Sequence, residues 1–268
     1  MTAEQKQNAA HFLDAAEDFL YTGYSKGLRL RNFSDDPSPG VFSDFATGVS
    51  KAFKTSALDL GKELERLNDE IAHCRCCPLA GSRKLSGLGV LSRPLVLVLG
   101  EAPVKTSDGT PLPFGQEQLQ FLDKMLFSIG LSSKTNCFVT SLVKCAPEEG
   151  VPPDESAKKT CRHFLNRQID FLNPYVILLI GDASTKSFFS DRVFTGTCGC
   201  WNEWQSPSGR KISTLPFLGL DGLVKEVAKG EEKTLRALAW KHLKTLSRRL
   251  VTLDSRYEKQ IQELRKEH

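Results

Sequence analysis

Residues 95–99 constrain the fold of this chain more than any other stretch. Five apolar residues, Leu-Val-Leu-Val-Leu, form an uninterrupted run that ends at Gly100. Such a run without polar alternation is typical of a strand that is buried on both faces, as in a parallel sheet covered by helices. In open α/β sheets, ligands bind just outside the carboxyl ends of the strands. The loop after Gly100 is therefore the first place to look for a functional site, and the alternative is an ordinary βα connection with surface acids.

Further β-like runs alternate with helical patterns along the chain. Strands are expected at residues 137–142, 175–180 and 212–215, and a small hairpin at 198–209. Apolar residues at helical spacing predict helices at about 56–72, 117–129, 154–171, 183–189 and from about 231 onward. This alternation predicts an α/β fold, a three-layer sandwich with a central four-stranded parallel sheet.

The two ends of the chain differ from this central pattern. Residues 3–31 have apolar side chains at helical spacing, and residues 33–50 are rich in Ser, Asp, Pro and Gly. We therefore expect a helical extension with a linker at 1–50, a main domain at 51–252 and a charged tail at 253–268.

Composition excludes some classes of protein. Of the 268 residues, 40% are hydrophobic and 25% are charged, as in ordinary globular proteins, and the net charge of +4 is compatible with a nucleic-acid partner. No apolar run reaches the length of a membrane span, and the N-terminus lacks the pattern of a signal peptide. We expect a cytoplasmic, monomeric protein without a membrane partner.

The cysteines suggest a metal centre. In a cytoplasmic chain, eight cysteines are expected to be free thiols or metal ligands rather than disulfides. Cys74 and Cys77 have the spacing of a chelating pair, and Cys145 and Cys161 lie at the edges of predicted elements. Thiolates bind zinc or an iron–sulfur cluster, and spacing does not separate the two. The alternative is that Cys145 and Cys161 are ordinary buried thiols.

Several motifs occur in an order that resembles the iron–sulfur uracil-DNA glycosylases of family four. They are Cys-Arg-Cys-Cys-Pro-Leu at 74–79 followed by Arg83, Gly-Glu-Ala-Pro at 100–103, Pro-Phe at 113–114, Val-Lys-Cys at 143–145, and Cys161. The resemblance covers about residues 70–250. The combination is specific to the family, whereas each motif alone is not.

The resemblance implies a uracil-DNA glycosylase-like fold and a function in base-excision repair. The implied reaction is hydrolysis of the N-glycosidic bond of a uracil that has been flipped out of DNA. The implied cofactor is a structural 4Fe-4S cluster, with zinc as the alternative that spacing leaves open. Its ligands would be Cys74, Cys77, Cys145 and Cys161.

The resemblance also assigns roles in the substrate site. Phe114 would stack on the uracil base, and Glu101 and Asp108 would be the catalytic carboxylates. The other substrate-binding positions would be Gly100, Ala102, Ser141 and Leu215.

Two of these positions depart from the family pattern. Ser141 stands where the family has an asparagine that recognises the uracil edge, and Leu215 stands where the second motif has a histidine. A serine hydroxyl does not offer the paired donor and acceptor of an amide, and leucine donates no hydrogen bond to an oxyanion. Two interpretations follow: a DNA glycosylase with altered activity, or a catalytically impaired, cluster-bearing protein that binds DNA in an accessory role.

Overall fold

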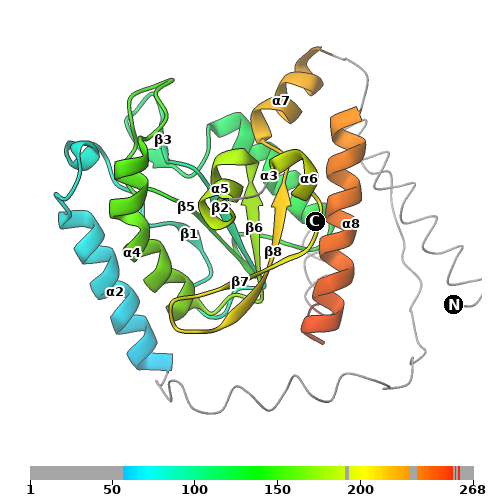
Figure 1. Cartoon of the computed structure of the whole chain (residues 1–268), viewed down its shortest axis with the longest axis horizontal. Coiled ribbons are helices and arrows are strands. Elements are labelled where there is room, and N and C mark those ends of the chain that lie inside the picture. Colours follow the sequence, from blue (N-terminus) through cyan, green and yellow to red (C-terminus); the bar gives the residue numbers. More distant parts are fainter. Residues whose placement is uncertain (1–56, 191–192, 230–233, 256, 258, 260–268) are drawn as a thin grey trace, which may run out of the picture. The chain divides into compact units, whose positions relative to one another are not determined.

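The computed structural model describes residues 57–190, 193–229, 234–255, 257 and 259 (Figure 1). The predicted extension at 1–50 and most of the predicted tail at 253–268 lie outside the described residues, so these boundaries stay predictions. The sheet belongs to a compact unit that begins at Gly61.

The main sheet is mixed, with a parallel centre. Its six strands have the order β1-β5-β2-β6-β8-β7, and the four central strands are parallel neighbours. The edge strands β1 and β7 are antiparallel, so the predicted sheet of four strands is the centre of a wider one. The strands are β1 (Leu88–Gly89), β2 (Val96–Gly100), β5 (Cys137–Ser141), β6 (Val176–Ile180), β7 (Asn202–Gln205) and β8 (Lys211–Phe217).

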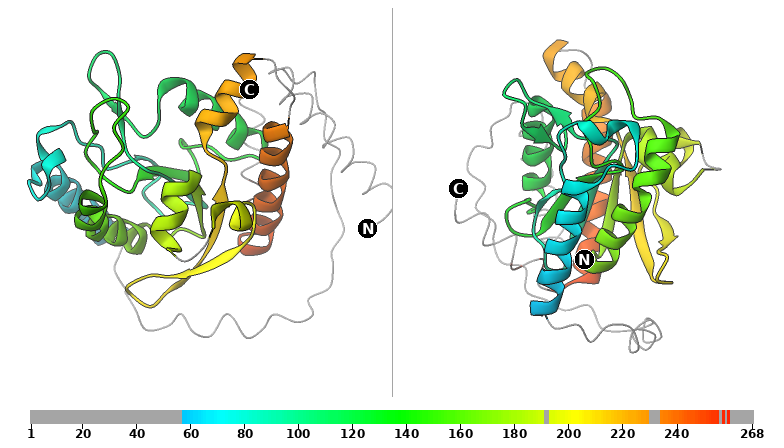
Figure 2. Two further views of the ribbon diagram at one scale, coloured as in Figure 1. Left: turned by 45° about the horizontal axis from the view of Figure 1, so that its top comes forward. Right: turned by 90° about the vertical axis from the view of Figure 1, so that its left-hand side faces the viewer.

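Helices cover both faces of the sheet. Every residue of β2, β5 and β6 is buried, as the continuous apolar runs predict. The connection from β2 to β5 contains α3 (Gln116–Ser128), and the connection from β5 to β6 contains α4 (Glu155–Leu172). These crossovers run in opposite directions across the sheet, so right-handed connections place α3 and α4 on opposite faces (Figure 2, right).

The ends of α4 show how local sequence sets an element's bounds. The Asp154 side chain accepts a hydrogen bond of 2.6 Å from the backbone N–H of Ala157, which caps the first turn. Asn173 ends the helix in the left-handed conformation, with φ of 49°. The remaining helices are α2 (Ala57–His73), α5 (Gly181–Phe188), α6 (Phe194–Thr197), α7 (Leu220–Lys229), α8 (Thr234–Leu253) and the 3-10 helix η2 (Pro78–Gly81).

No helix within the described ranges has both the length and the apolar character needed to cross a bilayer.

The predicted hairpin at 198–209 is wrong in its position. The hairpin consists of β7 and β8, which pair antiparallel with Trp204 opposite Ile212. Its turn contains Gly209, whose φ of +84° favours glycine. The turn at 206–210 therefore joins β7 to β8. The sequence analysis instead placed a complete hairpin within 198–209 and a separate strand at 212–215.

The carboxyl ends of the parallel strands define one edge of the sheet. Strand β2 ends at Gly100 beside Ser141, its register partner at the end of β5. The chain then enters residues 101–115, here called the motif loop. This loop contains a two-stranded hairpin of β3 (Val104–Lys105) and β4 (Pro111–Leu112). The sheet therefore presents the motif loop where ligands bind in α/β folds.

Candidate functional site

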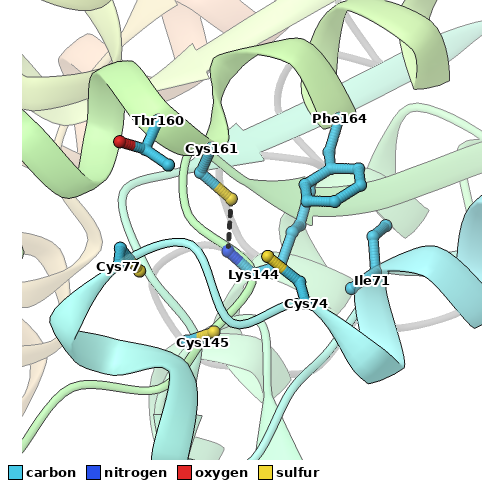
Figure 3. Close-up of a pocket in the computed structure, with 8 residues that line it drawn as sticks. All are labelled: Ile71, Cys74, Cys77, Lys144, Cys145, Thr160, Cys161 and Phe164. Carbon is cyan, nitrogen blue, oxygen red and sulfur yellow. Dashed lines mark hydrogen bonds between the residues drawn. The ribbon is translucent and has the colours of Figure 1, made fainter.

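Four cysteine side chains, here called the cysteine centre, line one small pocket. Figure 3 shows their sulfur atoms arranged around a common space, with Ile71 and Phe164 beside them. The segment after α2 provides Cys74 and Cys77, the segment after β5 provides Cys145, and α4 provides Cys161. The structure thus brings together the four thiols that the sequence analysis selected from eight.

The environment of the cysteine centre is apolar. Cys145 and Cys161 are buried, and Cys74 and Cys77 are half-buried. Burial raises the pKa of Cys145 to about 11 and also raises the pKa values of Cys74 and Cys161. The backbone N–H of Lys144 donates to the Cys161 sulfur over 3.3 Å (Figure 3). A positive metal centre would offset the cost of charging these thiols.

The donor set of the cysteine centre is compatible with more than one metal group. Within the described part of the chain, no three His, Cys, Asp or Glu side chains already lie in an arrangement that could hold a metal ion. An all-thiol donor set is typical of iron–sulfur clusters as well as of zinc, so the four thiols alone do not separate the two.

Phe114 lies directly on the end of β2. A Cβ atom at Gly100 would be only 2.7 Å from Cε1 of the Phe114 ring, closer than two carbon atoms can lie without repulsion. Glycine at position 100 therefore lets the ring contact the strand backbone. Phe114 is half-buried, and Pro113 before it is buried. The ring is held at the carboxyl edge of the sheet, as a stacking platform requires.

Glu101 forms an ion pair that the sequence did not reveal. Its Oε1 atom is 2.8 Å from Nζ of Lys158, on the second turn of α4. Lys158 also contacts Glu155 over 2.9 Å. Burial lowers the pKa of Lys158, but the hydrogen bonds to the two carboxylates outweigh it and raise this pKa above its usual value. Lys158 lies outside every motif named above, so only the fold identifies it.

Asp108 lies at the exposed tip of the β3–β4 hairpin. Its carboxylate accepts hydrogen bonds from the hydroxyl group of Thr106 and, over 2.9 Å, from the backbone N–H of Thr110. These bonds lower the pKa of Asp108. The contacts are those of a residue that stabilises a turn. The catalytic role of Asp108 stays a prediction.

Ser141 is buried, and its hydroxyl group bonds within its own chain segment. Oγ donates to the carbonyl oxygen of Val143 over 2.7 Å, so its single hydrogen is already used. Ala102 of the motif loop packs against the apolar cluster that contains Val143 and Cys161. The segment after β5 therefore connects the motif loop to the cysteine centre.

Backbone hydrogen bonds strengthen this connection. The N–H groups of Leu142 and Val143 donate to the carbonyl oxygens of Gly100 and Glu101, over 3.0 and 3.2 Å. These bonds fix the start of the motif loop relative to Cys145.

Leu215 lies inside the sheet rather than at its edge. Leu215 belongs to β8, where its register partner is Leu178 of the neighbouring strand β6. It is fully buried and lies two residues before Phe217, the last residue of β8. Its side chain presents no exposed surface to a base. The role of Leu215 in substrate binding stays a prediction that this position does not favour. Half-buried Leu218 follows the strand at the carboxyl edge.

The family comparison and the similar proteins both point to uracil-DNA glycosylases. The model of the uracil DNA glycosylase superfamily matches residues 87–264. A type-4 uracil-DNA glycosylase of Sulfurisphaera tokodaii is 33% identical over 129 residues, which cover 47% of this chain and 58% of the relative. The enzyme of the same name from Saccharolobus solfataricus is 32% identical over 47% of this chain and 59% of the relative. A third, from Thermotoga maritima, is 32% identical over 48% of this chain and 66% of the relative. The chain thus matches less than two thirds of the length of these relatives.

Proposed function

Because the chain belongs to the uracil DNA glycosylase superfamily, we propose that it is a DNA N-glycosylase that hydrolyses the bond between uracil and deoxyribose. The observation that carries the proposal is the packing of Phe114 on Gly100, beside Glu101 at the carboxyl edge of the sheet. The proposed partner is DNA. A monomeric state and a cytoplasmic location stay predictions from the sequence.

The motif loop has the groups that this reaction needs. A flipped uracil would stack on Phe114, because the flat face of a base packs favourably on an aromatic ring. As the glycosidic bond breaks, positive charge develops on the sugar and negative charge on the departing base. The Glu101 carboxylate would stabilise the sugar and orient the attacking water. Lys158 would hold this carboxylate in place through the 2.8 Å ion pair.

We propose that the cysteine centre holds a structural 4Fe-4S cluster. The four sulfur atoms surround one space in an apolar environment, which supports an all-thiolate metal centre; the family resemblance favours the cluster over zinc. When bound, the cluster would crosslink the end of α2, the segment after β5 and α4. The motif loop shares backbone hydrogen bonds with the segment after β5, so this crosslink would stabilise the base site indirectly.

A second candidate function is DNA binding without efficient catalysis. The observations that favour it are the Ser141 hydroxyl group, which donates to Val143, and the buried position of Leu215. Neither side chain offers a free donor to the developing charge on uracil.

One incubation separates the two functions. Purified protein is mixed with a uracil-containing oligonucleotide, and abasic sites are then cleaved with alkali. Cleavage above that of a Phe114→Ala variant supports the glycosylase. Cleavage no higher than that of the variant, with DNA binding retained, supports the accessory role instead.

A further inference from the structure

A second hollow, here called the cation groove, lies between the end of α2 and η2. It is lined by Ala72, His73, Arg75, Ala80, Gly81 and Lys84. Three of these six residues carry nitrogen donors, the other three are small, and none has a carboxylate. The groove is therefore open and electropositive, which suits an anionic ligand.

Two of the three nitrogen-bearing side chains of the groove, Lys84 and Arg75, have N–H groups left for a ligand. Nζ of Lys84 donates to the carbonyl oxygen of Ala80 over 2.8 Å, which uses one of its three N–H groups. Nδ1 of His73 is 2.8 Å from the carbonyl oxygen of Asp69 and must carry the hydrogen, because a carbonyl only accepts. Arg75 is exposed, and neither Arg75 nor Lys84 forms an ion pair with any described residue.

The groove is connected to the motif loop by a short stretch of backbone. Lys84 forms a β-bridge with Cys145, and the N–H of Ala146 donates to the carbonyl oxygen of Arg83 over 2.9 Å. The guanidinium group of Arg83 lies beside Gly109 in the motif loop, 3.7 Å from where a Cβ atom would be. Two adjacent residues therefore connect the two features: Lys84 lines the cation groove, and Arg83 contacts the motif loop.

We propose that the cation groove binds one backbone phosphate of the DNA strand whose flipped base enters the motif loop. Phosphate contacts fix the register of a protein on DNA without reading its sequence, and arginine binds phosphate through its planar fork of donors. This inference rests on the proposed function but concerns binding rather than chemistry.

The test uses the full chain and fluorescence anisotropy with a labelled, uracil-free duplex oligonucleotide over a series of salt concentrations. The variant is Arg75→Gln with Lys84→Gln. The matched control, Lys241→Gln with Arg248→Gln, removes the same charge from exposed positions on α8. Because Arg75 lies between two proposed cluster ligands, visible absorbance and circular dichroism of each variant are compared with those of the unmodified protein. If the spectra of the double variant differ from those of the unmodified protein, the single variant Lys84→Gln is used in its place.

We expect the groove variant to bind roughly tenfold more weakly and the slope of log affinity against log salt to fall by about 0.9, the value for one phosphate. The control should change the slope less. Equal losses of DNA affinity in the two variants, or an unchanged affinity of the groove variant, would refute the proposed phosphate site. If the unmodified protein binds no DNA at low salt, the proposed function fails together with the groove.

Discussion

Nζ of Lys158 lies 2.8 Å from Oε1 of Glu101, which joins α4 to the first residue of the motif loop. The Lys158 side chain is only 15% exposed and that of Glu101 33%, so water screens the pair less than it screens a surface ion pair. This contact gives Glu101 a fixed orientation at the carboxyl edge of the sheet.

Replacing Lys158 should therefore impair uracil excision. Because loss of the ion pair frees the Glu101 side chain to rotate, we expect Lys158→Ala to lower the single-turnover rate roughly 10- to 100-fold, and Lys158→Arg to retain most of it. The control is Lys159→Ala, which removes a neighbouring exposed charge from the same helix. Equal rates for the two alanine variants would show that the ion pair does not position Glu101.

Substitution of Gly100 should disturb the Phe114 platform. A methyl group there would meet the ring at 2.7 Å, so we expect Gly100→Ala to cost about 1–3 kcal/mol of unfolding free energy and to reduce excision. Gly61→Ala is the matched control. It has no neighbouring atom within 4 Å and lies in α2, where alanine should stabilise by about 0.5–1 kcal/mol. Urea unfolding measures the change in unfolding free energy for both variants. Changes of the same sign would contradict the packing of Phe114 on Gly100.

The cysteine centre predicts a difference between neighbouring cysteines. We expect Cys145→Ser to abolish the visible absorbance of an iron–sulfur cluster and to lower the thermal midpoint, because a thiol ligand is lost. Cys76→Ser should change neither, since Cys76 is exposed and does not line the pocket. A colourless protein that contains zinc would refute the cluster and leave the four thiols as a zinc site.

Asp108 provides a test between turn stabilisation and catalysis. An asparagine oxygen accepts the same hydrogen bonds from Thr106 and Thr110, so we expect Asp108→Asn to leave the thermal midpoint nearly unchanged and to retain excision within a few fold. Asp108→Ala should destabilise more. A large loss of excision in the asparagine variant at an unchanged thermal midpoint would instead assign a catalytic role to the carboxylate.

The sequence predicted the elements whose patterns are local. The buried strands β2, β5 and β6 follow from continuous apolar runs, and α4 follows from its periodicity and the Asp154 cap. The two-residue strands β1, β3 and β4 were missed, because such short segments carry too few residues to establish a period. Helix α7 was also missed, although its ten residues are enough for a helical period.

The contacts within the candidate site depended on the fold. The cysteines were selected from the sequence because their residue type already limits what they bind. The packing of Phe114 on Gly100 and the pairing of Lys158 with Glu101 join segments that are distant along the chain, so no local pattern indicates them. The role of Leu215 stays a prediction, and its buried position within β8 could not be read from the sequence, because a motif position does not specify where a strand ends.

A cluster bound at the cysteine centre, as proposed, would close a ring of chain that contains β2, the motif loop and β5, whereas the hydrogen bonds of the sheet lie elsewhere. Outside the cysteines, α2 is held by the packing of Leu67 and Ile71 against α4 and by an ion pair of Glu70 with Arg167. Loss of such a cluster would therefore release the end of α2 and the cation groove before it affects the sheet. Under the proposed function, this loss would weaken DNA binding in a chain whose sheet remains folded.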